Sequence, residues 1–160
     1  MKLGMAIRDV HSAEAALASE LLDLGERHKV DHDVYHLTRS LASQAQERMK
    51  ALEDHAERHG ESLDDEDPGG GGMLAAVREK GAELVGRRPE PGLLLLRDMR
   101  KLHLLAAEAS IDWTILGQGA QAARDRELLA TVAECHPDAL RTLRWTTTKL
   151  KETAPQVLTS

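Results

Sequence analysis

One carboxylate, Glu14, lies where the first helical pattern of the chain requires an apolar side chain. The apolar residues of that helix face recur on both sides of it: Leu3, Ile7, Val10, Leu17, Leu21 and Leu24. An ionised carboxylate inside an apolar face is costly unless a cation, a metal ion or a proton neutralises it. The group that neutralises Glu14 therefore indicates whether the protein binds a metal ion or has a purely structural role for this residue.

Two further polar residues fall on apolar faces, Arg48 in the second helical segment and His136 in the fourth. Arginine is always charged and can hold a carboxylate with two parallel hydrogen bonds, so Arg48 is the preferred partner of Glu14. His136 is expected to hydrogen-bond to a neighbour such as Glu108 or Asp112. A shifted helix register that exposes Glu14 to solvent remains the alternative.

The elements that must position these residues are four long helices and one short one, with no strand pattern. The first helix is expected over about residues 4–28. Asp31 or Asp33 can cap the second, because a short acidic side chain accepts from free N–H groups of the first turn, and Gly60 can end it.

The third helix is predicted over about residues 93–118. Beyond its core face it carries a second apolar strip of Leu104, Ile111 and Ile115. A helix that is apolar on two faces is central or is covered by another element or subunit. We expect the short helix or a second copy of the chain to cover this strip.

The fourth helix is predicted to begin at a cap on Asp125 and to end near residue 151. Pro137 lies inside it and removes one backbone donor, so a kink or a loosened turn is expected there. Pro155 is expected to close the C-terminal tail that follows the helix.

Residues 61–72 are acidic, contain a proline and end in four glycines, so they are predicted to form a flexible linker. A short helix over about residues 73–85 follows. Residues 1–160 are thus expected to form one all-α domain, an antiparallel four-helix bundle made of two helical hairpins joined by a long crossover.

In length, helix order and crossover the chain resembles the ferritin-like superfamily. Members of this superfamily that bind two iron ions take one glutamate from each of two helices and a Glu-x-x-His pair from each of the other two. Glu14 matches the first single glutamate, and Glu108 lies at the analogous height of the third helix. The resemblance thus implies iron or another divalent metal as the alternative partner of Glu14, bound by Glu14, Glu108 and His136.

The paired motifs of that metal site are absent from the sequence. Arg48 and Ala45 take the inward positions of the second helix where histidine and glutamate are expected, and Ala133 precedes His136 where glutamate is expected. A buried ion pair is therefore preferred over a metal site, and the preferred expectation is that the protein has neither a cofactor nor a catalytic residue.

Several histidines lie four residues apart near the ends of the second helix, among them His28, His32, His55 and His59. The other helices lack the partner motifs of a hemerythrin-like metal site, so these histidines are expected to be solvated or to cap helix ends.

Composition excludes several classes of function. Aromatic residues make up 2% of the chain and its net charge is −6, which argues against nucleic-acid binding. The longest purely apolar run, residues 93–96, is far too short for a membrane span, and no secretory signal is visible. With Cys135 as the single cysteine, the default expectation is a cytoplasmic protein.

The predicted topology gathers cations at the end of the bundle that holds the turn between the first two helices. They are Arg27, Lys29, Arg39, Arg97, Arg100, Lys101, Lys149 and Lys151. An anion or an acidic partner could bind there. The preferred overall hypothesis is a non-catalytic helical bundle that acts by self-association, for example as a dimer, or by partner binding; the alternative is a ferritin-like redox or metal-storage protein.

Overall fold

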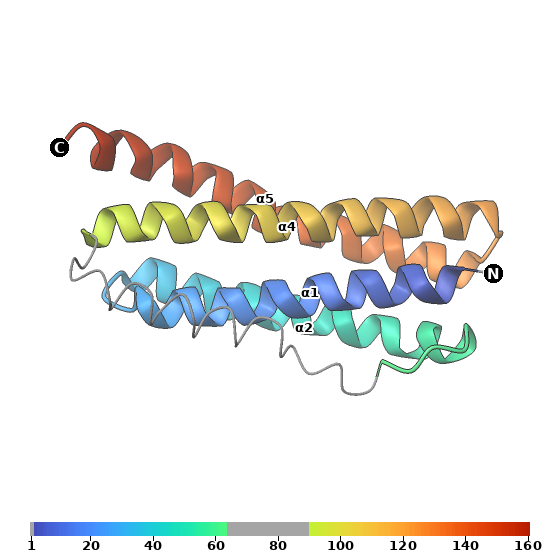
Figure 1. The fold of residues 1–160 in the computed structure, drawn as a ribbon. Helices are drawn as coiled ribbons and strands as arrows, with labels where there is room; N and C mark the ends of the chain where they lie inside the picture. Colours follow the sequence, from blue (N-terminus) through green and yellow to red (C-terminus); the bar gives the residue numbers. More distant parts are fainter. Residues whose placement is uncertain (1, 64–89) are drawn as a thin grey trace.

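The computed structural model describes residues 2–63 and 90–160. Over these residues it is all-helical, with α1 (Leu3–Arg27), α2 (His32–Arg58), α4 (Pro91–Ala122) and α5 (Arg126–Leu158). The four helices pack together, and Figure 1 shows α1 beside α2 and α4 beside α5 as two hairpins. The predicted four-helix bundle is confirmed.

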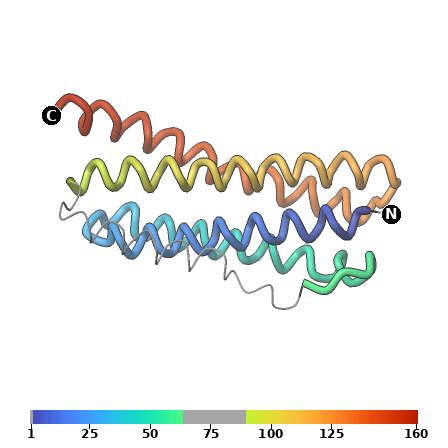
Figure 2. Tube along the Cα trace, viewed as in Figure 1, coloured from blue at the N-terminus to red at the C-terminus, as the bar shows by residue number. Residues whose placement is uncertain are grey.

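The two hairpins meet mainly through α1 and α4, while α2 and α5 contact each other less extensively. The trace in Figure 2 places the two chain ends at opposite ends of the bundle. The start of α4 lies beside the α1–α2 turn, as expected, because Asp98 of α4 contacts His28 at the end of α1. Most of the predicted 61–72 linker, and the whole predicted short helix, lie outside the described residues.

Polar caps define where two of the helices begin. The side chain of Asp31 accepts from the backbone N–H of Val34 at the start of α2. Asp125 does the same for Leu128 at the start of α5. Both caps were expected from the sequence, since carboxylate oxygens satisfy N–H groups that have no partner within the helix.

Helix α5 is longer than predicted, because it continues through Pro137 and Pro155 to Leu158. Each proline removes the N–H that would bond to the carbonyl four residues earlier. Those carbonyls belong to Ala133 and Lys151, which are both exposed, so solvent can satisfy them. The expected helix end near residue 151, with Pro155 in the tail after it, is therefore wrong. In Figure 1 the C-terminal half of α5 runs away from α1 and α2.

The core consists of two apolar clusters along the bundle axis. One contains Val10, Leu52 and Trp113, and the other contains Leu17, Leu41 and Ala109. Along α1, α2 and α4, one cluster ends and the other begins at the same height in the bundle, which is the height of Glu14 and Arg48. A polar layer therefore divides the core. None of the described helices contains a segment long and apolar enough to span a membrane.

Candidate functional site

Glu14 is completely buried, and both of its carboxylate oxygens accept hydrogen bonds from neighbouring helices. Arg48 of α2 donates from Nε to Oε1 at 2.8 Å and from Nη2 to Oε2 at 2.9 Å. Trp113 of α4 donates from its indole Nε1 to Oε1 at 2.7 Å. The pairing of Glu14 with Arg48 expected from the sequence is thus present, in the two-pronged geometry that favours arginine.

Asp138 of α5 completes the buried layer on the other side of Arg48. The Nη1 atom of Arg48 donates to Oδ2 of Asp138 at 2.7 Å. The Asp138 side chain is 27% exposed, and its other oxygen lies 3.3 Å from Nη1 of Arg141. One cluster of charged and polar side chains thus joins all four described helices, and two acidic groups balance two guanidinium groups.

The environment keeps Arg48 charged. Burial by itself lowers the pKa of its guanidinium, but the hydrogen bonds and charge of Glu14, followed by those of Asp138, raise the pKa above its usual value overall. A permanently charged arginine lies within hydrogen-bond distance of the only fully buried carboxylate of the described residues. The layer therefore holds Glu14 by charge pairing.

This arrangement does not fit a metal ion at Glu14. Both oxygens of Glu14 are already occupied by donors, and a guanidinium takes the place where a metal ion would need to bind. Glu108 is exposed on the outside of α4, and His136 hydrogen-bonds elsewhere. Within the described residues, no group of three or more histidine, cysteine or acidic side chains is arranged to hold a metal ion.

His136 is half-buried, and the partner predicted for it is wrong. Its Nε2 lies 3.1 Å from the hydroxyl of Ser110, and not against Glu108 or Asp112. Ser110 follows Ala109 on the side of α4 that faces α5, whereas Glu108 points outward. The rotation of α4 relative to α5 determines this partner, and the spacing of apolar residues within one helix does not predict that rotation.

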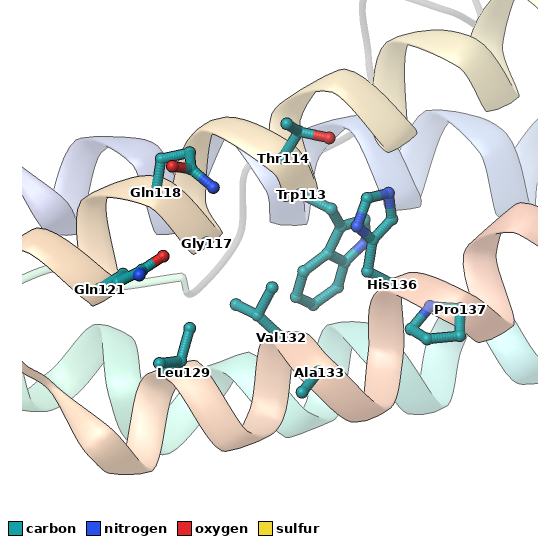
Figure 3. A pocket seen from close by; sticks show the side chains of 10 residues that line it. All are labelled: Trp113, Thr114, Gly117, Gln118, Gln121, Leu129, Val132, Ala133, His136 and Pro137. Carbon is teal, nitrogen blue, oxygen red and sulfur yellow. The ribbon is translucent and has the colours of Figure 1, made fainter.

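A groove of about 370 Å³ runs between α4 and α5 next to His136. Figure 3 shows the side chains that line it, with Trp113 from α4 and Val132 and Pro137 from α5 among them. The lining is mostly apolar. The one hydrogen-bonding atom of the Trp113 ring already donates to Glu14, so it offers the groove no donor.

Cys135, the only cysteine, is buried in the same region. Burial is the main reason that the pKa of its thiol rises from 9.0 to about 11. Because the thiolate is the reactive form, this cysteine is not an activated nucleophile at neutral pH.

A second buried charge cluster, which the sequence patterns did not reveal, lies near the α1–α2 turn. Arg27 donates to Glu20 at 2.8 Å and to Asp98 at 3.2 Å. Lys101 donates to Glu20 at 2.8 Å, and His28 donates from Nε2 to Asp98 at 2.7 Å. Glu20 and Asp98 are each only 6% exposed, so this cluster joins α1 to the start of α4 in the interior. In the sequence, the only sign of this cluster is an acidic residue next to the apolar face of each helix, Glu20 in α1 and Asp98 in α4.

The hydrogen bonds to Asp98 shift its acidity. Burial would raise the pKa of this carboxyl, but the bond from His28 and the positive charge of Arg27 more than offset it, so the pKa lies below 3.8. Several cations predicted to gather at this end have acidic partners within the chain: Arg27, Lys29, Lys101 and Lys149.

The histidines at the end of α2 are also more involved than predicted. His55 is buried, and its Nε2 lies 2.8 Å from the hydroxyl of Thr131 in α5. Burial, followed by the charge of Arg58, lowers the pKa of His55. His28 and His55 are therefore not solvated, because the ends of α1 and α2 pack against α4 and α5. His28 and His59 do lie at helix ends as expected, at the C-caps of α1 and α2. His59 lies 2.9 Å from Asp125, and both side chains are partly exposed.

The second apolar strip of α4 faces solvent. Leu104, Ile111 and Ile115 are 53%, 59% and 57% exposed. Arg97, Arg100 and Glu108 are exposed on the same side of the helix, and none has an ion-pair partner among residues 2–63 and 90–160. We call these six residues the outer face of α4.

No family model matches this chain, and neither a curated protein nor a solved structure matches it.

Proposed function

We propose that this protein is a non-catalytic helical bundle of the ferritin-like type that acts by associating with further copies of itself through the outer face of α4. Two features of the structure support this proposal. The buried acid is neutralised by Arg48, and large apolar side chains are exposed in one line on α4.

The ferritin-like part of the proposal is supported by the order and pairing of the helices. Two helical hairpins are separated by a long connection between Arg58 and Pro91, and α1 packs against α4. This is the connectivity of ferritin-like bundles, with one long crossover. In such bundles facing side chains can hold two metal ions, but here the corresponding layer holds Glu14, Arg48 and Trp113. The metal-binding alternative therefore has no specific observation in its favour.

The exposure of Leu104, Ile111 and Ile115 is the observation that carries the proposal. Each is more than half exposed, and they lie at positions four and seven apart on one side of α4. Scattered apolar residues are normal on a protein surface, but large apolar side chains gathered on one side of a helix support an interaction site there.

Sedimentation velocity over a range of protein concentrations tests the proposal. We expect the protein to associate as its concentration rises, and the double variant Leu104→Glu, Ile115→Glu to remain monomeric with unchanged helix content. Val30→Glu is the matched control, because Val30 is 90% exposed in the turn after α1. A protein that stays monomeric up to high micromolar concentration would contradict the proposal.

A further inference from the structure

The charges on the outer face of α4 are arranged around Leu104. Arg100 lies four residues before Leu104 and Glu108 lies four residues after it. Leu93 and Ile115 lie eleven residues before and after the same position. The sequence of this face therefore carries opposite charges at equal distances from a central apolar residue.

This symmetry matters when two such helices are placed face to face. In an antiparallel pair centred on Leu104, residues at equal distances before and after the centre lie opposite each other. Leu104 then meets its own counterpart, and Arg100 meets Glu108 of the partner subunit. Because the arrangement is twofold symmetric, the ion pair forms twice.

Charge disfavours a parallel pair and a shifted antiparallel pair. In a parallel pair, Arg97, Arg100 and Glu108 would each meet an identical residue, and like charges repel. In an antiparallel pair that matches Leu104 with Ile111 of the partner subunit, the two Glu108 carboxylates approach each other. That register also places Arg100 against apolar Ile115 of the partner subunit. Of these three arrangements, the register centred on Leu104 is the one that pairs Leu104 with itself and Arg100 with Glu108; it also places Ile111 opposite Arg97 of the partner subunit.

We propose that two copies of this chain associate through antiparallel packing of α4 about Leu104, with Arg100 paired to Glu108 of the partner subunit on both sides of the twofold axis. This inference rests on the proposed function and specifies the partner and the geometry. In a single chain, neither Arg100 nor Glu108 has an ion-pair partner within the described ranges, and Leu104 is 53% exposed. A contact through one helix per subunit is small, so the dissociation constant of the dimer is expected to be on the order of micromolar.

Exchanging the two charges provides the first test. Arg100→Glu and Glu108→Arg should each weaken dimerisation by about tenfold or more, because each creates two repulsive pairs. An equimolar mixture of the two variants should dimerise as well as the original protein, because every mixed pair then joins opposite charges. Arg144→Glu on the exposed side of α5 is the control and should leave dimerisation unchanged. Sedimentation equilibrium measures the dissociation constants, and circular dichroism checks that each variant is folded.

Disulfide cross-linking provides the second test, in a Cys135→Ala background that removes the native thiol. Leu104→Cys should form a covalent dimer under a mild added oxidant, since the two thiols meet at the twofold axis. Ile111→Cys is the matched control and should not do so, because Ile111 lies opposite Arg97 of the partner subunit. A parallel dimer would instead cross-link both variants.

The outcomes separate this inference from the proposed function. Association that is lost in Leu104→Glu, Ile115→Glu but not restored by mixing the charge variants overturns the antiparallel register and leaves the proposed function standing. Equal cross-linking of Leu104→Cys and Ile111→Cys does the same. Absence of any association overturns both.

Discussion

At the scale of single residues, the main feature is a carboxylate that the core tolerates because donors surround it. Glu14 accepts from two nitrogen atoms of Arg48 and from the indole of Trp113. Removing one member of a buried ion pair leaves the other charge without compensation, whereas replacing both with apolar residues is far less costly. This difference is the basis for a direct test of the pair.

We expect Glu14→Leu to reduce the free energy of unfolding by about 3–5 kcal/mol, because Arg48 then keeps only Asp138 as a partner. Adding Arg48→Met should restore part of this loss. What remains is the unpaired N–H of Trp113, at about 1–3 kcal/mol. Urea unfolding followed by circular dichroism measures all three proteins. Equal stability of the single and double variants would show that the two residues are not coupled.

At the scale of helices, α1 and α2 approach closely near their shared turn. Gly25 of α1 faces Thr38 of α2, and a Cβ atom at Gly25 would lie 2.2 Å from the Thr38 hydroxyl oxygen. Thr38 is fully buried, and its hydroxyl donates to the carbonyl of Val34 at 2.7 Å. The side chain is therefore fixed, and the glycine sets the distance between the two helices.

In an ordinary helix interior, exchanging glycine for alanine stabilises by about 1 kcal/mol. At Gly25 we expect the opposite: Gly25→Ala should destabilise by about 1–3 kcal/mol through overpacking. The combination Gly25→Ala, Thr38→Ala should recover part of the loss. Gly119→Ala is the control, because the nearest atom there is the end of the Leu3 side chain, which can move. Thermal unfolding would contradict the close contact if Gly25→Ala raised the melting temperature.

At the scale of the whole molecule, buried charge clusters join helices that are distant in sequence. The Glu14 cluster contains residues of all four described helices, and the Asp98 cluster joins α4 to the end of α1. In the second cluster, the pKa of the Asp98 carboxyl lies below its usual value. The stability of the bundle should therefore depend on pH through Asp98.

An acid with a lowered pKa in the folded state contributes stability above its pKa in the unfolded chain, and that stability is lost as the pH falls through the folded value. We expect Asp98→Asn to be less stable than the original protein at pH 7. The difference should shrink as the pH falls below 3.8, the usual value for this group. Urea unfolding from pH 7 down to about 2 measures this. Asp23→Asn, at an exposed position of α1, controls for loss of one charge, and a difference independent of pH would contradict the expectation.

The sequence by itself determined the four described helices, most of their boundaries and the pairing of Glu14 with Arg48. Each of these follows from local rules, since caps act on the next turn and apolar spacing fixes which residues face the core. Glu14 and Arg48 were found because each interrupts such a face.

Only the tertiary structure decided the remaining partners. The positions of Asp138 against Arg48, of Ser110 against His136 and of His28 against Asp98 depend on how far one helix is rotated and shifted against another. Rotation and shift result from the packing of many side chains at once, and no single helix encodes them. For the same physical reason, the exposure of Leu104 became clear only when the bundle placed the opposite side of α4 in the core.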